Sequence, residues 1–268
     1  MADAPRLQED HDLGPLPNWD LGDLYASQTD PAIARDLETA ESASAAFSNR
    51  YRGRLAMLDG AALGGAVAEF ERIDEILARL MSYAHLVHAG DLADPEGGRF
   101  FQDIQEKVTT IGSATLFFNL ELNQIEDAVM VEHLTDPALL RYAPWVRNSR
   151  AYRPHQLAED MERLLHEKHV AGRAAWVRLF DETMVALRFD MRGRALTSAE
   201  VFHLLSDRDA TVRRDAAQSV GRTLAAHGRI FAHITNTLAK DKEIEDRWRH
   251  FERPMSARNL SNQVEDKV

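Results

Sequence analysis

Two histidines and a glutamate have a spacing at which side chains could bind a metal ion. Glu162, His166 and His169 lie at i, i+4 and i+7, so a helix through them places all three on one face. Imidazole and carboxylate groups are good zinc ligands. The zincin motif, however, is His-Glu-x-x-His, whereas this stretch reads His-Glu-Lys-His and is one residue short.

Geometry also disfavours three ligands from this one helix. The Cα atoms of Glu162 and His169 would be roughly 10 Å apart along the helix axis, so both side chains would have to bend toward His166. We therefore predict no metal ligand in this chain and a solvated or capping role for this face. A pair of histidines completed by ligands from elsewhere stays open.

A cluster of aromatic residues and arginines could stack on nucleic-acid bases. It comprises Tyr142, Trp145, Tyr152, Arg141, Arg147, Arg150 and Arg153. The formal net charge of the chain is −11, which opposes binding to a polyanion or to an anionic membrane surface. We therefore predict a packed loop with cation–π contacts, and no nucleic-acid or membrane partner.

No other catalytic pattern stands out. The chain has no cysteine, which excludes disulfides, thiolate metal sites and cysteine nucleophiles. It also has no Gly-x-Ser-x-Gly element, and acidic pairs such as Asp181-Glu182 are typical of a solvated surface. The sequence thus identifies no catalytic residue and leaves the substrate-binding residues unknown.

Length and composition are those of a globular protein. The 268 residues suffice for one large domain or two smaller ones, with 44% hydrophobic and 28% charged residues. The first residues lack a basic start followed by an apolar run, and no stretch approaches the ~18–20 apolar residues that span a bilayer. We expect a soluble, cytoplasmic protein.

Two long helices give the clearest periodicity, and they predict a mainly α fold. The first apolar seam contains Val67, Phe70, Ile73, Leu77, Leu80, Ala84 and Val87. The second contains Phe101, Ile104, Val108, Ile111, Thr115, Phe118, Leu122 and Ile125. Because the link at Asp94-Pro95-Glu96 is short, we predict a long antiparallel helical hairpin whose helices are each roughly 40 Å long.

Further helices are predicted along the rest of the chain. They cover about 31–58, 127–134, 138–147, 155–170, 173–185, 198–205 and 207–248. The buried face of the helix from 155 is predicted to contain Leu157, Met161, Leu164 and Leu165. On the next helix the core-facing stripe is predicted to be Trp176, Leu179, Phe180 and Thr183.

One stretch changes from the helical period to a period of two. Leu187, Phe189 and Met191 alternate with charged residues, and Gly193 supplies a turn. This pattern predicts one small β-hairpin near 186–197. Because an isolated hairpin is marginal in water, it must pack against the helices.

These patterns occur in an order that resembles a known family. The matching residues are Glu167-Lys168, Gly172-Arg173, Ala175-Trp176, Leu179-Phe180-Asp181-Glu182, Leu187-Arg188-Phe189 and Gly193. Further matches are Pro17-Asn18-Trp19-Asp20-Leu21, the run from Asp209 to Ala217, Arg253-Pro254 and Arg258-Asn259-Leu260-Ser261-Asn262. Over nearly its whole length the chain resembles the N-terminal half of oligoendopeptidase F, a bacterial zinc peptidase of the M3 (thimet oligopeptidase) family.

The resemblance implies a mostly helical peptidase that encloses a deep channel and hydrolyses short peptides. In that family zinc is held by the two histidines of His-Glu-x-x-His and a later glutamate, all in the C-terminal half. This sequence contains no such motif, so no catalytic or metal-ligating residue carries over. Zinc is expected for a full-length member, whereas we expect this chain alone to bind none and to be inactive.

The resemblance also divides the chain into parts. Residues 1–19 are expected to form an extended N-terminal arm and 20–195 a helical N-terminal domain. Residues 196–268 are expected to be the start of the peptidase catalytic domain, cut before the zinc motif.

The C-terminal residues favour the same interpretation. Leu260, Val264 and Val268 lie at i, i+4 and i+8, so a helix through them would carry an apolar stripe that needs a partner. We therefore expect the chain to be an N-terminal fragment.

An alternative hypothesis is a helical-repeat binding module without catalysis. The stretch from Leu204 to Leu224 resembles one HEAT-type repeat. A solenoid needs about three or more stacked repeats to bury a continuous core, and only one is visible. A long helical hairpin with one β-hairpin favours the peptidase interpretation.

Overall fold

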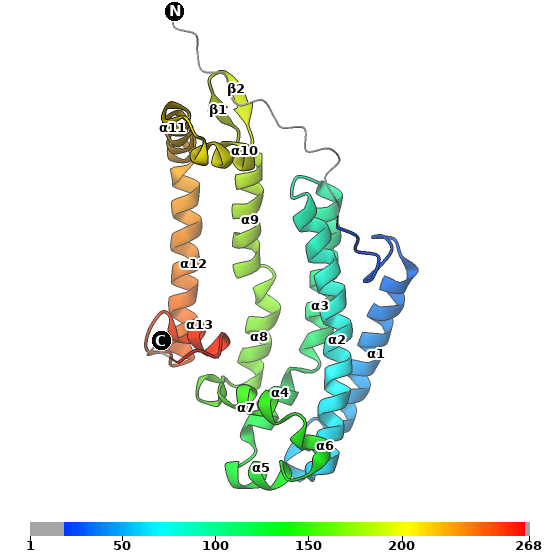
Figure 1. Cartoon of the computed structure of the whole chain (residues 1–268). Coiled ribbons are helices and arrows are strands. Elements are labelled where there is room, and N and C mark those ends of the chain that lie inside the picture. Colours follow the sequence, from blue (N-terminus) through cyan, green and yellow to red (C-terminus); the bar gives the residue numbers. More distant parts are fainter. Residues whose placement is uncertain (1–18, 266–268) are drawn as a thin grey trace, which may run out of the picture.

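The structure is a computed structural model that describes residues 19–265 (Figure 1). Within that range the fold is mainly α with one two-stranded sheet, as predicted, and no helix is long and apolar enough to cross a membrane. The extended arm predicted for 1–19 lies outside the described residues except for Trp19. The elements are α1 Pro31–Tyr51, α2 Gly60–Gly90, α3 Pro95–Ser113, α4 Leu116–Gln124, α5 Asp127–His133, α6 Pro137–Leu140, α7 Ala143–Arg150, α8 Glu159–His169, α9 Arg173–Ala186, β1 Phe189–Met191, β2 Arg194–Leu196, α10 Ser198–His203, α11 Ala210–Ala226, α12 Gly228–Trp248 and α13 Ser256–Ser261.

The helices α2 and α3 form the predicted antiparallel hairpin, with α1 packed beside them (Figure 1). Each begins at an aspartate that caps its first turn. The Asp59 carboxylate accepts from the Ala62 N–H, and the Asp94 carboxylate accepts from the N–H groups of Glu96 and Gly97. Both caps are local sequence signals, which is why the starts of these helices were predictable.

The second helix of the hairpin was predicted as one continuous helix, and this prediction is wrong. The helix breaks at Ala114 and Thr115, and α4 starts at the next residue. The Thr115 Oγ1 donates to the carbonyl oxygen of Gly112 (3.0 Å), a bond that competes with the helical ladder. On the new helix Phe117 and Phe118 are both fully buried.

The first predicted helix is also shorter than expected. It ends at Tyr51 rather than near Leu58, and Gly53 then adopts a left-handed backbone with a φ of 75°. The Gly53 N–H donates to Glu121 Oε1 on α4 (2.6 Å). A contact over this separation in sequence leaves no local signal.

An aromatic core joins α1, α2, α4 and α7 at the base of the molecule. The ring centroid of Phe47 lies 5.8 Å from that of Phe117 and 5.1 Å from that of Phe118. Phe118 in turn stacks on Phe70 at 4.9 Å and on Trp145 at 6.3 Å. Offset and edge-on packing of these rings stabilises the base.

From this base the chain extends as an arm, which we define as residues 159–248. Its helices α8 and α9 lead away from the base, and α12 returns beside α9 (Figure 1). The predicted buried face of α8 is wrong, because Leu164 is 58% exposed and Leu165 38% exposed. The residues of α8 that turn toward the protein are instead polar, as described below.

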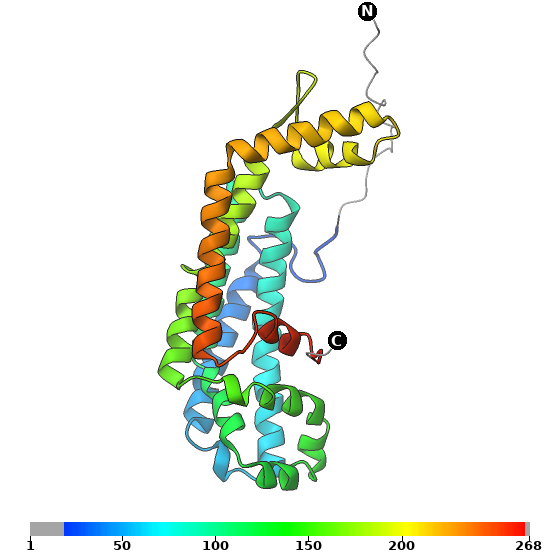
Figure 2. The same cartoon turned by 90° about the vertical axis from the view of Figure 1, so that its left-hand side faces the viewer.

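At the far end of the arm the predicted long helix is two helices. They are α11 and α12, which meet at His227 at a steep angle (Figure 2). The cap of α11 is Asp209, whose carboxylate accepts from the Thr211 N–H, so the helix begins slightly later than the predicted 207. A capping box of Thr197 and Glu200 starts α10.

The predicted β-hairpin is confirmed. Phe189 on β1 pairs with Leu196 on β2, and both side chains are buried. The two turn residues, Arg192 and Gly193, have φ values of 54° and 83°, as a tight type I′ turn requires. The hairpin packs against α10 and α11, which gives it the support that two strands alone lack.

The same packing bears on the helical-repeat alternative. Between residues 19 and 265, α10 and α11 pack on the β-hairpin and do not stack on a second, equivalent helix pair. The long helical hairpin with one β-hairpin is the outcome that favours the peptidase interpretation.

The C-terminal stripe does not form on one helix. A Schellman closure ends α13: the Val264 N–H donates to the carbonyl oxygen of Asn259 (2.9 Å), and Gln263 has a φ of 55°. Leu260 and Val264 therefore do not continue a common helical face. Val268 lies outside the described residues.

Candidate functional site

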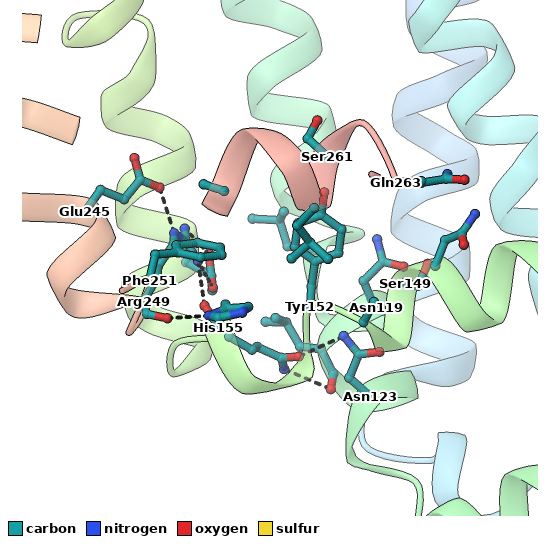
Figure 3. Close-up of a pocket in the computed structure, with 18 of the residues that line it drawn as sticks. Asn119, Asn123, Ser149, Tyr152, His155, Glu245, Arg249, Phe251, Ser261 and Gln263 are labelled. Atoms are coloured by element: carbon teal, nitrogen blue, oxygen red, sulfur yellow. Dashed lines mark hydrogen bonds and ion pairs between the residues drawn. The ribbon is translucent and has the colours of Figure 1, made fainter. Parts of the chain in front are cut away.

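A pocket of about 840 Å³ lies where the end of α12 meets the base of the molecule. Its walls come from α4, α7, the segment before α8, the end of α12, and α13 (Figure 3). Side-chain amides are its commonest polar groups: Asn119, Asn123, Asn148, Gln156 and Gln263. The lining combines segments far apart in the sequence, so no local motif marks the site.

Two asparagines one turn apart on α4 form an amide wall of the pocket (Figure 3). Asn123 Nδ2 donates to Gln156 Oε1 (3.0 Å), and Gln156 Nε2 donates to the carbonyl oxygen of Leu120 (3.0 Å). The side-chain oxygens of Asn119 and Asn123 are buried without a hydrogen-bond partner among the described residues. An unpaired buried acceptor costs about 1–3 kcal/mol, so these two oxygens lower the local stability, while the amide side chains of α4 still line the pocket.

Aromatic and aliphatic side chains form the rest of the wall. Trp145, Tyr152 and Phe251 line the pocket together with Leu116 and Leu260. Trp145 is held in place by its stacking in the aromatic core. Apolar surface with a few amides is typical of a site for an uncharged ligand.

Arg249 pairs with the two carboxylates that line the pocket, Glu162 and Glu245. Arg249 Nη1 and Nη2 donate to the two carboxylate oxygens of Glu162 (2.7 and 2.9 Å), and Arg249 Nε donates to Glu245 (2.7 Å). Burial raises the pKa of Glu162, but the hydrogen bonds from Arg249 and from the Leu157 N–H, together with the charge of Arg249, outweigh it, so the pKa of Glu162 is lowered. The hydrogen bonds to Glu162 and Glu245 raise the pKa of Arg249, so the pair stays charged.

His155 and Phe251 extend this ion pair. His155 Nδ1 donates to the carbonyl oxygen of Arg249 (2.8 Å), and its ring stacks on Phe251 with centroids 3.8 Å apart. We call Glu162, Arg249, His155 and Phe251 the clasp. It ties the start of α8 to the end of α12 at one side of the pocket (Figure 3).

A backbone reversal brings the clasp together. The helix α12 ends in a Schellman closure, in which His250 has a φ of 59° and the Phe251 N–H donates to the carbonyl oxygen of Asp246 (2.8 Å). The reversal turns the chain so that Phe251 meets His155. Glycine usually marks this position, and a histidine there gives no sequence signal.

The three metal-ligand candidates of the sequence do not converge. Glu162 is held by Arg249, His166 Nε2 lies 3.0 Å from the carbonyl oxygen of Thr109, and His169 is exposed. In the described part of the chain no group of three or more His, Asp or Glu side chains is placed to hold a metal ion. The solvated role predicted for this face applies to His169 but not to the other two. These residues do not fit a zinc site.

The arginine and aromatic cluster is packed into the base. The guanidinium carbon of Arg141 lies 4.4 Å from the ring centroid of Tyr142, the predicted type of cation–π contact. Arg150 donates to the carbonyl oxygens of Leu122 (2.8 Å) and Ile125 (2.7 Å). Arg150 thus closes the C-terminal end of α4.

The amide wall and Arg249 were not among the residues predicted from the sequence. The one available signal was the amide spacing on α4, where Asn119 and Asn123 follow the apolar residues Phe118 and Leu122 by one position each. Amide side chains at these positions indicate that this face of the helix does not pack into the hydrophobic core. Arg249 had no such signal, because its partners lie far away in the sequence.

Comparison with known proteins adds family information for part of the chain. No curated protein matches it. The family model Peptidase_M3_N, described as oligopeptidase F, matches residues 121–189. That range runs from within α4 to the start of β1 and includes much of the pocket lining.

Solved structures share the fold. Oligoendopeptidase-F from Enterococcus faecium has a TM-score of 0.77 at 18% identity, over 88% of this chain and 47% of that chain. A presumed peptidase from Chlamydophila abortus has a TM-score of 0.58 at 18% identity, over 93% of this chain and 42% of that one. The chain thus spans less than half the length of these structures. The resemblance seen in the sequence is confirmed: residues 121–189 match the oligopeptidase F model, and the chain has the fold of part of an oligoendopeptidase F.

Proposed function

We propose that this chain is the N-terminal, peptide-holding portion of a zinc-dependent metalloendopeptidase related to oligoendopeptidase F. The observation that carries the proposal is the fold match over 88% of the chain, supported by the family model at 121–189. In this proposal residues 20–195 form the helical N-terminal domain and 196–268 begin the catalytic domain. The core that the β-hairpin shares with α11 joins the two.

The pocket supports a role in holding short peptides. A peptide backbone offers uncharged N–H and C=O groups, and the amide side chains that line the pocket, among them Asn119, Asn148 and Gln263, can pair with both. Tyr152 and Phe251 supply apolar surface for side chains. Because Arg249 is already paired with Glu162 and Glu245, its charge is not available to the carboxylate at the C-terminal end of a peptide.

The chemistry itself is assigned to polypeptide outside this sequence. The residues described above do not fit zinc, and the chain lacks His-Glu-x-x-His, so we assign it no step of hydrolysis. Zinc, when bound in the remaining part, would polarise the scissile carbonyl and activate water. A cytoplasmic location is part of the proposal and suits a chain without cysteine.

Two measurements on the purified chain test the proposal. Elemental analysis should find zinc well below one ion per chain, and quenched-fluorescent peptides of mixed sequence should remain uncleaved. An intact oligoendopeptidase F is the positive control for the peptides. Stoichiometric zinc whose chelation abolishes cleavage by this chain would show the proposal to be wrong.

A further inference from the structure

The helices α8, α9 and α12 bury almost none of their side chains. In the described part of the chain α8, α9 and α13 contain no buried residue and α12 only Ile234, whereas α2 buries eleven of its 31 residues. A helix in a globular protein is stabilised mainly by packing its apolar face. One side of the arm therefore still needs a packing partner.

Large apolar side chains are exposed on these helices. Leu164 is 58% exposed, Phe180 42%, Ile244 40% and Trp248 51%. Ile244 and Trp248 are four residues apart and form one stripe along α12. Several such side chains on neighbouring helices indicate an interaction surface rather than isolated exposed residues.

The stripe on α12 continues onto α8 across a shallow hollow of about 460 Å³. Met161 lines one side of the hollow and Trp248 the other, and Leu165 follows Met161 by one helical turn. Figure 2 faces α12 and shows no other described helix lying over this side. We call Met161, Leu165, Ile244 and Trp248 the open seam.

We propose that the open seam binds a helical segment from the remaining part of an oligoendopeptidase-type fold. The inference rests on the proposed function. The matching structure from Enterococcus faecium has more than half of its length outside the match, so the fold contains further polypeptide that could cover this side. A second copy of this chain is a poorer occupant, because each copy carries a net charge of −11.

Hydrogen exchange of the chain by itself gives the first test. Backbone amides of α8 and α9 should exchange much faster than those of α2, because no buried side chain covers them. Protection of α8 and α9 equal to that of α2 would overturn the proposal, since these helices would then need no partner.

Co-purification gives the second test and names the occupant. The chain is co-expressed with the part of the Enterococcus faecium oligoendopeptidase-F that lies outside the match, and complexes are recovered through a tag on one of them. We expect a 1:1 complex, with slowed exchange in α8 and in the second half of α12. Leu165→Asp and Ile244→Asp should each lower its yield by about tenfold or more.

Leu86→Asp is the matched control, because Leu86 is 46% exposed on α2, away from the open seam. Three outcomes would each overturn the proposal. The first is that no complex forms, and the second is that Leu86→Asp and Ile244→Asp lower its yield equally. The third is that the chain forms a homodimer that Ile244→Asp abolishes. The readout is mass rather than cleavage. A complex without peptidase activity would therefore count against the proposed function alone.

Discussion

Glu162 and Arg249 form a bidentate ion pair between residues 87 positions apart in the sequence. Both side chains are largely buried, at 15% and 19% exposed. The pair closes the arm at its base and fixes the end of α12. It thereby holds Phe251 at the wall of the pocket. The shape of the pocket therefore depends on how the arm packs against the base.

Removing one partner of this pair should destabilise the chain. Arg249→Met leaves the Glu162 carboxylate without its partner, and we expect a loss of about 2–3 kcal/mol in the free energy of unfolding, below the cost of a fully buried pair. The double variant Arg249→Met/Glu162→Met should lose less than the sum of the single variants. Urea unfolding measures all three.

The matched control is Arg247→Met, because Arg247 pairs with Glu243 on the same helix at 64% and 47% exposure. An exposed pair contributes roughly 0–1 kcal/mol. Equal losses for Arg247→Met and Arg249→Met would mean that the clasp is no more than a surface ion pair.

The pH dependence of stability should contain a contribution from Glu162. Its pKa is lowered in the folded chain, so its stabilisation is present above its ordinary pKa and is lost as the pH falls through the folded value. Glu162→Gln should therefore be less stable than the parent chain at neutral pH, and the difference should shrink below about pH 4.5. Unfolding in urea across pH 3.5–7 measures the difference; a constant gap contradicts the assignment.

Replacing Asn119 should affect binding and stability in opposite directions. Asn119→Leu removes an unpaired buried acceptor at similar volume, so we expect unchanged or slightly higher thermal stability. The same change removes an amide that lines the pocket and should weaken binding of a neutral peptide by about fivefold to tenfold. Gln124→Leu, an exposed position on the same helix outside the pocket, should leave binding unchanged.

Two adjacent glycines on α2 should respond oppositely to alanine. A Cβ at Gly64 would lie 2.5 Å from the carbonyl carbon of Ala138 in α6, so Gly64→Ala must push backbones apart and should cost about 1–3 kcal/mol. Gly65 has nothing within 4 Å, and Gly65→Ala should gain up to about 1 kcal/mol through helix propensity. Thermal unfolding compares them, and equal shifts would contradict the close approach of α2 and α6.

Elements with local signals were predictable from the sequence. Asp59 and Asp94 mark the starts of α2 and α3, and the alternation before Gly193 marks the β-hairpin. Helix ends were predicted less evenly: α12 ends at Trp248 as predicted, whereas α1 ends at Tyr51 rather than near Leu58, and Gln263 ends α13 in a left-handed backbone position that glycine usually marks. Sequence periodicity also cannot detect a cap that residues outside a helix provide.

The pocket was not predictable for a different reason. Its clasp depends on pairing Arg249 with a residue in another helix, and only the assembled fold brings them together. The histidine pair attracted attention because its spacing is local, yet His166 bonds to the backbone of α3 and His169 faces solvent. In this chain local spacing was informative about caps and turns, and long-range contacts determined the site.

The most direct test of the account is peptide binding by this chain in the absence of any metal. NMR titration with a neutral, N-acetylated and C-amidated peptide of about five residues should shift the side-chain amide signals of Asn119, Asn148 and Gln156 together, since these groups line one pocket. Saturable shifts at these residues, weakened by Asn119→Leu, are the predicted result. Absence of binding at millimolar peptide, or shifts confined to residues outside the pocket, would contradict the account.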